Sequence, residues 1–247
     1  MNWFGKDRNG AHAAQRTSPR EVILEGVPPI RVSLKQSARA RRISLRVSRL
    51  DGRVSLTMPK GGSEREALAF LREKEVWLRH QLVVQPPVAG LGFGGEVLFE
   101  GHPLTIVAGS GRSARIVGNT LTVPGDDAGV GAKVAAFMKA RARPRLSAAS
   151  HFYADRLGKP VGRITLRDTR SRWGSCSSEG NLNYSWRLIM APAHVLDYVA
   201  AHEVAHLQEM NHSQAFWDVV DRLYGPCEAQ RTWLRKEGHL LHRVSFD

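Results

Sequence analysis

Apolar and polar residues alternate over two stretches of the N-terminal half. The alternation runs through residues 43–47, stops at Asp51-Gly52, and resumes through residues 54–58 before Pro59. Successive side chains of a strand face opposite sides of the sheet, so two alternating runs around a turn dipeptide predict a β-hairpin. Ser63 and Glu66 then have capping-box spacing, and leucines at helical spacing predict a helix until Pro86-Pro87.

Short apolar runs separated by glycine-containing turns follow this helix and are typical of strands. They occupy residues 97–99, 104–107, 116–117 and 121–123. Residues 1–20 are polar and aperiodic, so we expect a flexible tail there. The sequence therefore predicts a β-rich region over residues 21–127.

Helical spacing dominates the remainder of the chain. It begins near Lys133, is expected to be interrupted at Pro144, and continues to Gly158. Alternation at residues 163–167 and 182–186 predicts two strands, and three further helices are expected at about residues 192–210, 213–225 and 228–236. Together these patterns predict an α+β fold in two parts, with a second domain over residues 128–247.

Charge separates the two parts further. The 247-residue chain has 36 Lys and Arg against 23 Asp and Glu, a net charge of +13, and residues 1–60 alone hold 13 basic and 4 acidic side chains. Blocks of basic residues can bind the phosphates of nucleic acid without sequence preference, or can form solvated faces that keep a protein in solution. The sequence leaves both alternatives open.

Neither a membrane span nor a secretory signal is expected. No window approaches the roughly 18 uninterrupted apolar residues that a transmembrane helix needs, and the first thirty residues are interrupted by charges. We therefore expect a cytoplasmic protein with no membrane partner. Its oligomeric state is not indicated.

The chemistry is concentrated in His202-Glu203-Val204-Ala205-His206, an HExxH arrangement within the helix that starts near Pro192. Two residues four apart lie about 40° apart around a helix and about 6 Å apart along it, so both imidazoles can reach one ion. Glu203 flanks that face without displacing either ligand. It is placed to take a proton from a water that the metal activates.

A third ligand is expected from the turn that follows. Catalytic zinc sites usually have three protein ligands and one open position. His212 lies six residues after His206, and Asn211 tolerates the left-handed conformation that a returning turn can require. The alternative is a pair of buried helix histidines with His212 on the surface, but this leaves Glu203 as a buried ionisable group without a stated role.

Several of these segments resemble one family. The stretch from Thr169 to Ser177, the stretch from Trp186 to Pro192, the HExxH segment, and Asn211-His212-Ser213 with Phe216-Trp217 are similar to the YgjP-like zinc metallopeptidases, which are related to SprT-like proteins. The resemblance implies a zincin-like domain with His202, His206 and His212 as Zn²⁺ ligands and Glu203 as base. The ligand spacing also resembles the metzincins, but Glu209 stands where those enzymes have glycine.

Arg170, Arg172 and Trp173 belong to the most recognisable part of this resemblance. If residues 170–172 form a strand, the two arginines face the same side, where a guanidinium can hold a carboxylate or phosphate. We therefore consider all three as substrate-binding residues. A structural tie between strand and helix is the alternative for the arginines.

The function expected from these features is zinc-dependent peptide hydrolysis, with a peptide or protein as substrate. A metal-dependent nucleoside triphosphate pyrophosphatase is the first alternative, suggested by the arginines and by pyrophosphatase assignments within the family it resembles. A nucleic-acid-binding protein with a structural metal is the second. A structural zinc usually has four protein ligands, and the sequence offers three.

Overall fold

The computed structural model describes residues 20–48, 52–83 and 90–246. These residues form two compact units, which we call the N-terminal unit (20–83) and the C-terminal unit (90–246). The expected α+β fold is confirmed. The division differs from the predicted boundary at residues 127/128, because the strands between residues 96 and 124 share a hydrophobic core with the helices that follow them.

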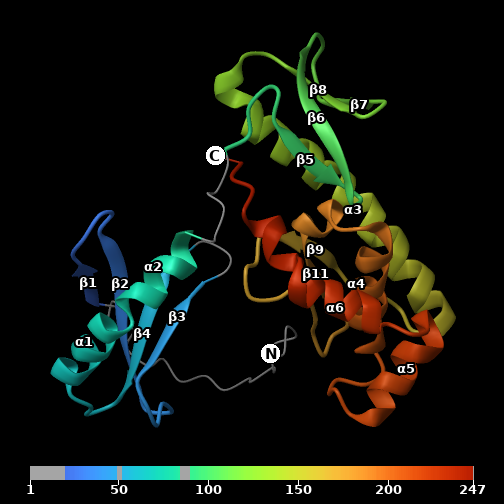
Figure 1. The fold of residues 1–247 in the computed structure, drawn as a ribbon. Helices are drawn as coiled ribbons and strands as arrows, with labels where there is room; N and C mark the ends of the chain where they lie inside the picture. Colours follow the sequence, from blue (N-terminus) through green and yellow to red (C-terminus); the bar gives the residue numbers. More distant parts are fainter. Residues whose placement is uncertain (1–19, 49–51, 84–89, 247) are drawn as a thin grey trace. The chain divides into compact units, whose positions relative to one another are not determined.

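The N-terminal unit is a four-stranded sheet with two helices (Figure 1). The strands are β1 (Arg20–Leu24), β2 (Ile30–Ser37), β3 (Ser44–Val47) and β4 (Val54–Pro59), in the order β1-β2-β4-β3. The antiparallel pairing of β3 with β4 confirms the predicted hairpin. β1 and β2 were not predicted, and Arg20 of the expected tail lies in β1.

The N-cap residue Ser63 precedes the first helix of this unit. Ser63 Oγ accepts a hydrogen bond from the backbone N–H of Glu66 at 3.3 Å, as the capping sequence predicts. The expected single helix is divided at Lys74 into α1 (Glu64–Glu73) and α2 (Glu75–Val83). Leu71 and Leu78 of these helices are buried in one core with the apolar residues of β2 and β4.

The C-terminal unit has two small sheets joined by a long helix. The first contains β5 (Glu96–Phe99), β6 (His102–Gly109), β7 (Arg115–Val117) and β8 (Thr120–Pro124), in the order β5-β6-β8-β7. The second contains β9 (Ile164–Arg167), β10 (Gly174–Cys176) and β11 (Leu182–Ser185), in the order β10-β11-β9. β9 is parallel to β11, and β10 is antiparallel to it.

The long helix α3 (Val130–Leu157) runs without a break through Pro144, so the predicted interruption there is wrong. Proline removes one hydrogen bond, to the carbonyl of the residue four positions earlier. That residue, Ala140, is exposed, so its carbonyl lies on a side of the helix where water can replace the lost donor. The buried side of α3 packs against β8, β9 and the helices beyond and keeps it continuous (Figure 1).

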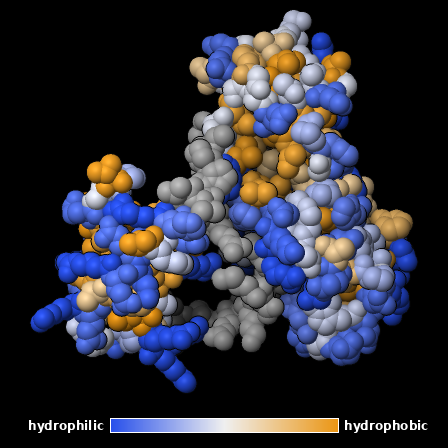
Figure 2. Space-filling model, in the orientation of Figure 1, coloured by the Kyte–Doolittle hydropathy of each residue, from blue (hydrophilic) through white to orange (hydrophobic). Residues whose placement is uncertain are grey.

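The remaining elements follow the second sheet. They are the short 3₁₀ helix η2 (Trp186–Met190), the helices α4 (Ala193–Ala205), α5 (Gln214–Tyr224) and α6 (Glu228–Lys236), and a second 3₁₀ turn, η3 (Gly238–His242). Figure 2 shows mainly hydrophilic residues over α5 and α6 on the visible face, and hydrophobic residues gathered around β5. No helix within the described residues is long and apolar enough to span a membrane.

Candidate metal centre

The site is built on α4, which is buried over most of its surface. Every residue from Tyr198 to Ala205 is buried, and His202 and Glu203 are 0% and 1% exposed. A helix with apolar residues on all sides belongs in a core, because no face of it can be given to water. α4 packs against α3, α5, α6 and β10, so the side chains of His202 and Glu203 are held inside the protein.

The chain reverses directly after the second histidine. The helix ends at Ala205, earlier than predicted, because the N–H groups of residues 207–209 bond back in turns. His206 Nδ1 lies 2.9 Å from the carbonyl oxygen of Glu209, so this nitrogen donates and Nε2 keeps its lone pair. The turn needs no left-handed residue at Asn211, contrary to expectation. Instead, Asn211 Oδ1 accepts from the N–H of Ser213 at 3.1 Å.

This reversal brings His212 back to the two helix histidines. One ligand atom from each of His202, His206 and His212 can be chosen so that all three lie within 4.8 Å of one another. The Nε2 atoms of His202 and His212 are 3.0 Å apart. Nitrogens that bind one Zn²⁺ tetrahedrally are about 3.4 Å apart, so this donor set fits a single transition-metal ion.

Burial favours the form of His202 that can bind a metal. Burial, and after it the charges that His206 and His212 can carry, lowers the pKa of His202 well below its usual range. The imidazole is therefore neutral at pH 7, which is the form that coordinates metals.

Aromatic residues of α5 hold the three rings in place. The Phe216 ring lies 4.4 Å from the His206 ring, 4.8 Å from the His202 ring and 4.7 Å from the His212 ring, centroid to centroid. Trp217 lies 5.8 Å from His202. In the sequence, both aromatics were noted as part of the family resemblance, without this role. Their position one helical turn after His212 is the signal that could have identified this supporting role.

Glu203 is in close contact with the backbone of β10. A Cβ atom on Gly174 would lie 2.5 Å from Glu203 Oε1, a distance that no real packing allows. Only glycine therefore lets this strand pass so near to the carboxyl group. Burial, and after it the nearby charge of Glu203, raises the pKa of Tyr184 on β11.

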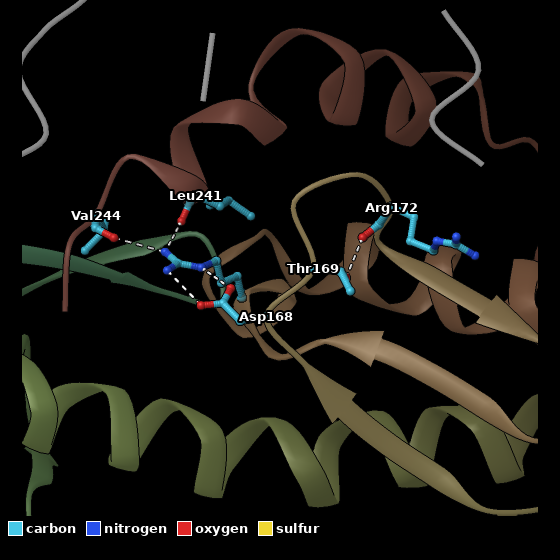
Figure 3. Close-up of polar contacts among 6 residues, drawn as sticks. Asp168, Thr169, Arg172, Leu241 and Val244 are labelled. Carbon is cyan, nitrogen blue, oxygen red and sulfur yellow. Dashed lines mark hydrogen bonds and ion pairs between the residues drawn. The ribbon is translucent and has the colours of Figure 1, made fainter. Parts of the chain in front are cut away.

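The three residues expected to bind substrate lie in one connection but differ in exposure. Residues 168–173 form a connection between β9 and β10 rather than a strand, so the argument that Arg170 and Arg172 share one strand face does not hold. Thr169 Oγ1 donates to the carbonyl oxygen of Arg172 at 3.0 Å and bends this connection (Figure 3). Trp173 is 1% exposed, and its ring stacks on the His242 ring at 4.9 Å between centroids.

A buried HExxH helix beside a small sheet, with a third histidine brought back to it, is typical of metal-dependent hydrolases. The family comparison makes this class specific, because the model of the YgjP-like metallopeptidase domain matches residues 41–237. The chain belongs to this family of metallopeptidases and is an enzyme with a metal cofactor that acts on peptide bonds.

Comparison with curated proteins found no match. Among solved structures, the chain is similar to the metallopeptidase zymogen of Pyrococcus abyssi abylysin, with 20% identity and a TM-score of 0.33. That similarity covers 42% of this chain and 99% of abylysin.

Proposed function

We propose that this metallopeptidase uses Zn²⁺, that His202, His206 and His212 hold the ion, and that Glu203 is the general base. The observation that carries the proposal is the convergence of three imidazoles, within 4.8 Å, beside a buried carboxyl group of the same helix. Three nitrogen ligands leave a fourth tetrahedral position open, which is typical of catalytic rather than structural zinc.

The separate roles of the zinc ion and of Glu203 follow from this arrangement. Bound zinc would polarise the scissile carbonyl and make a water more acidic. Glu203 takes the proton of that water and returns it to the leaving amine nitrogen. The contact with Gly174 restricts where the carboxyl group can lie, which keeps it oriented through both proton transfers.

The position of β10 supports an extended peptide as substrate. β10 lies at one edge of its sheet and, within the described residues, pairs only with β11. A peptide that adds to a sheet edge binds through main-chain hydrogen bonds, which are independent of its sequence. Because Gly174 of β10 contacts Glu203, a peptide on this edge would bring its backbone near the proposed base.

Arg170 and Arg172 remain proposed anchors for the substrate. Both lie in the connection that leads directly into β10, and Arg170 is exposed. A guanidinium there suits an acidic side chain or the terminal carboxylate of a peptide. Loss of substrate preference with little loss of turnover, after both are changed to Gln, would distinguish this role from a structural tie.

The alternative reactions have less support. Within the described residues, the three histidines form the only group of three or more potential ligands close enough to hold one ion. Hydrolysis of triphosphates normally recruits Mg²⁺ and several cations. In the part of the chain that the structure describes, no group of three or more carboxylates lies close enough to hold such an ion. Cytoplasmic location stays a prediction from the sequence.

A non-specific nucleic-acid partner is proposed for the N-terminal unit. Lys35 of β2 lies opposite Thr57 of β4, and Arg46 of β3 lies opposite Ser55 of β4. These residues share the face of the sheet that points away from the buried side chains of β2 and β4. Lys35 and Arg46 are exposed, so this polar sheet face can approach phosphates.

Glu203→Gln tests the proposed base. It keeps the shape of the side chain but removes the base, so bound zinc should stay at one equivalent while peptide hydrolysis falls by roughly 10²-fold or more. Metal is measured by elemental analysis, and turnover with an unfolded-protein or peptide-library substrate. Undiminished turnover would refute the role of Glu203, and loss of metal would make Glu203 a ligand.

A further inference from the structure

The C-terminal unit contains a pocket that none of the metal ligands lines. Its volume is about 430 Å³. α3 contributes Lys139 and Arg143, the end of β9 contributes Leu166, Arg167 and the following Asp168, and η2 contributes Trp186. This volume is within the range of small-molecule sites, about 300–1,000 Å³.

The charge of the pocket is strongly unbalanced. Lys139 and Arg143 are one helical turn apart, so their like charges face the same side of α3. Together with Arg167 they place three cations around one space, and none of the three has an ion-pair partner within the described residues. Arg145 on the same helix differs, because it pairs with Asp197 at 2.8 Å and with Glu100 at 3.3 Å.

The single carboxylate in the lining is already neutralised. Arg187 Nε lies 2.7 Å from Asp168 Oδ1, and its terminal nitrogen lies 3.1 Å from Oδ2 (Figure 3). Arg187 also donates to the carbonyl oxygens of Leu241 and Val244, which fixes its position. Burial alone would raise the pKa of Asp168, but the hydrogen bonds and charge of Arg187 lower it below the ordinary value. Asp168 is thus held ionised against Arg187, and Lys139, Arg143 and Arg167 remain to attract an anion.

We propose that this pocket binds the phosphate group of an organic phosphate. A phosphate offers several acceptor oxygens on one centre, which matches two guanidinium forks and an ammonium group better than a single carboxylate does. The group can come from a free nucleotide or from the phosphodiester backbone of a nucleic acid. The proposal concerns binding, and it depends on neither the metal nor the proposed base.

The test compares two charge-matched double variants of the full chain. Lys139→Gln with Arg143→Gln removes two cations of the pocket. Arg156→Gln with Lys159→Gln removes two exposed cations at and just beyond the C-terminal end of the same helix. Binding of ADP is measured by calorimetry, and binding of a labelled oligothymidylate by fluorescence anisotropy, both at low salt. A hexaglutamate peptide serves as a non-phosphate anion.

The expected result is a tenfold or greater loss of affinity for at least one phosphate probe in the pocket variant, with less than a twofold change in the control variant. A loss for ADP identifies a free nucleotide as the source, and a loss for the oligonucleotide alone identifies the phosphodiester backbone. Three results would overturn the proposal: no binding of either phosphate probe to the wild type, equal losses in both variants, or a pocket-dependent affinity for hexaglutamate alone. Arg167→Gln provides the same readout if the double variant does not fold.

Discussion

The candidate metal centre of the C-terminal unit and the sheet face of the N-terminal unit place their ionisable groups in opposite environments. In the C-terminal unit, His202, Glu203 and His206 are 0%, 1% and 9% exposed and lie on α4 or directly at its end. In the N-terminal unit, Lys35 and Arg46 lie on an exposed sheet face. Burial shifts the pKa of His202 strongly, whereas exposed charges interact with each other weakly through water. The comparison teaches that the candidate metal centre keeps its ionisable groups at fixed, buried positions, whereas the sheet face of the N-terminal unit exposes its charges to water.

The difference also predicts how each unit responds to substitution. Buried polar groups in contact are energetically coupled, so a substitution at one of them changes the interactions of the others. Exposed cations act almost independently, and each adds a small, nearly additive amount to the free energy of binding an anion. Four measurements test this contrast, from the largest expected effect to the smallest.

Loss of one proposed metal ligand should have the largest effect. His206→Ala should remove the bound metal and with it the peptidase activity, because two imidazoles with water as third ligand bind zinc far more weakly than three. His194→Ala is the matched control, since His194 is exposed on the same helix. Elemental analysis measures the metal content of both purified variants. An unchanged metal content in His206→Ala would rule out the proposed ligand set.

An added methyl group beside the proposed base should have the next largest effect. Gly174→Ala places a Cβ where it would lie 2.5 Å from Glu203 Oε1, so the carboxyl group must move. We expect kcat to fall by roughly 10²-fold with the metal retained, because a displaced base transfers protons poorly. Ser175→Ala, one residue further along β10, is the control. Equal kcat values for the two variants would show that the position of Glu203 is not critical.

A buried histidine remote from the ligands should make the C-terminal unit sensitive to acid. Burial, and after it the charge of Arg187, lowers the pKa of His242 to about 4; Arg170 acts in the same direction and Asp168 opposes them. The unfolded chain takes up this proton near pH 6.5 and the folded chain only near pH 4, so stability is complete above pH 6.5 and falls as the pH drops.

Between pH 7 and pH 5 this difference amounts to about 2 kcal/mol of unfolding free energy. Denaturant unfolding of the wild type and of His242→Gln at both pH values isolates it, because contributions from all other groups cancel in the comparison. If both proteins lose the same stability on acidification, His242 does not titrate as its burial predicts.

Neutralising the exposed sheet face should have the smallest effect. Lys35→Gln with Arg46→Gln should weaken binding of single- or double-stranded DNA by a few-fold and make log K less dependent on log salt by about 1 to 2 units. Arg65→Gln with Arg72→Gln removes two exposed cations from α1 and serves as the control. An equal change in both variants would mean that net charge, rather than this face, determines the affinity.

Local patterns in the sequence were sufficient for several elements. The alternation at residues 43–58 predicted the β3-β4 hairpin, and Ser63 predicted the start of α1. Ile30, Val32 and Leu34 alternate in the same way, so β2 had a signal that the basic residues around it obscured. The predicted break at Pro144 failed because packing along the buried side of α3 outweighs the loss of one exposed hydrogen bond.

The sequence by itself determined that His202 and His206 lie on one side, with Glu203 beside them, because residues four apart on a helix must share a face. It also indicated His212, since a short segment cannot go far from the helix that precedes it. Tertiary structure alone decided that Gly174 lies against Glu203, that Phe216 contacts all three imidazoles, and that cations of α3 and β9 surround one pocket. These contacts join residues far apart in the chain, or depend on how whole helices and strands pack, and no local periodicity encodes such packing.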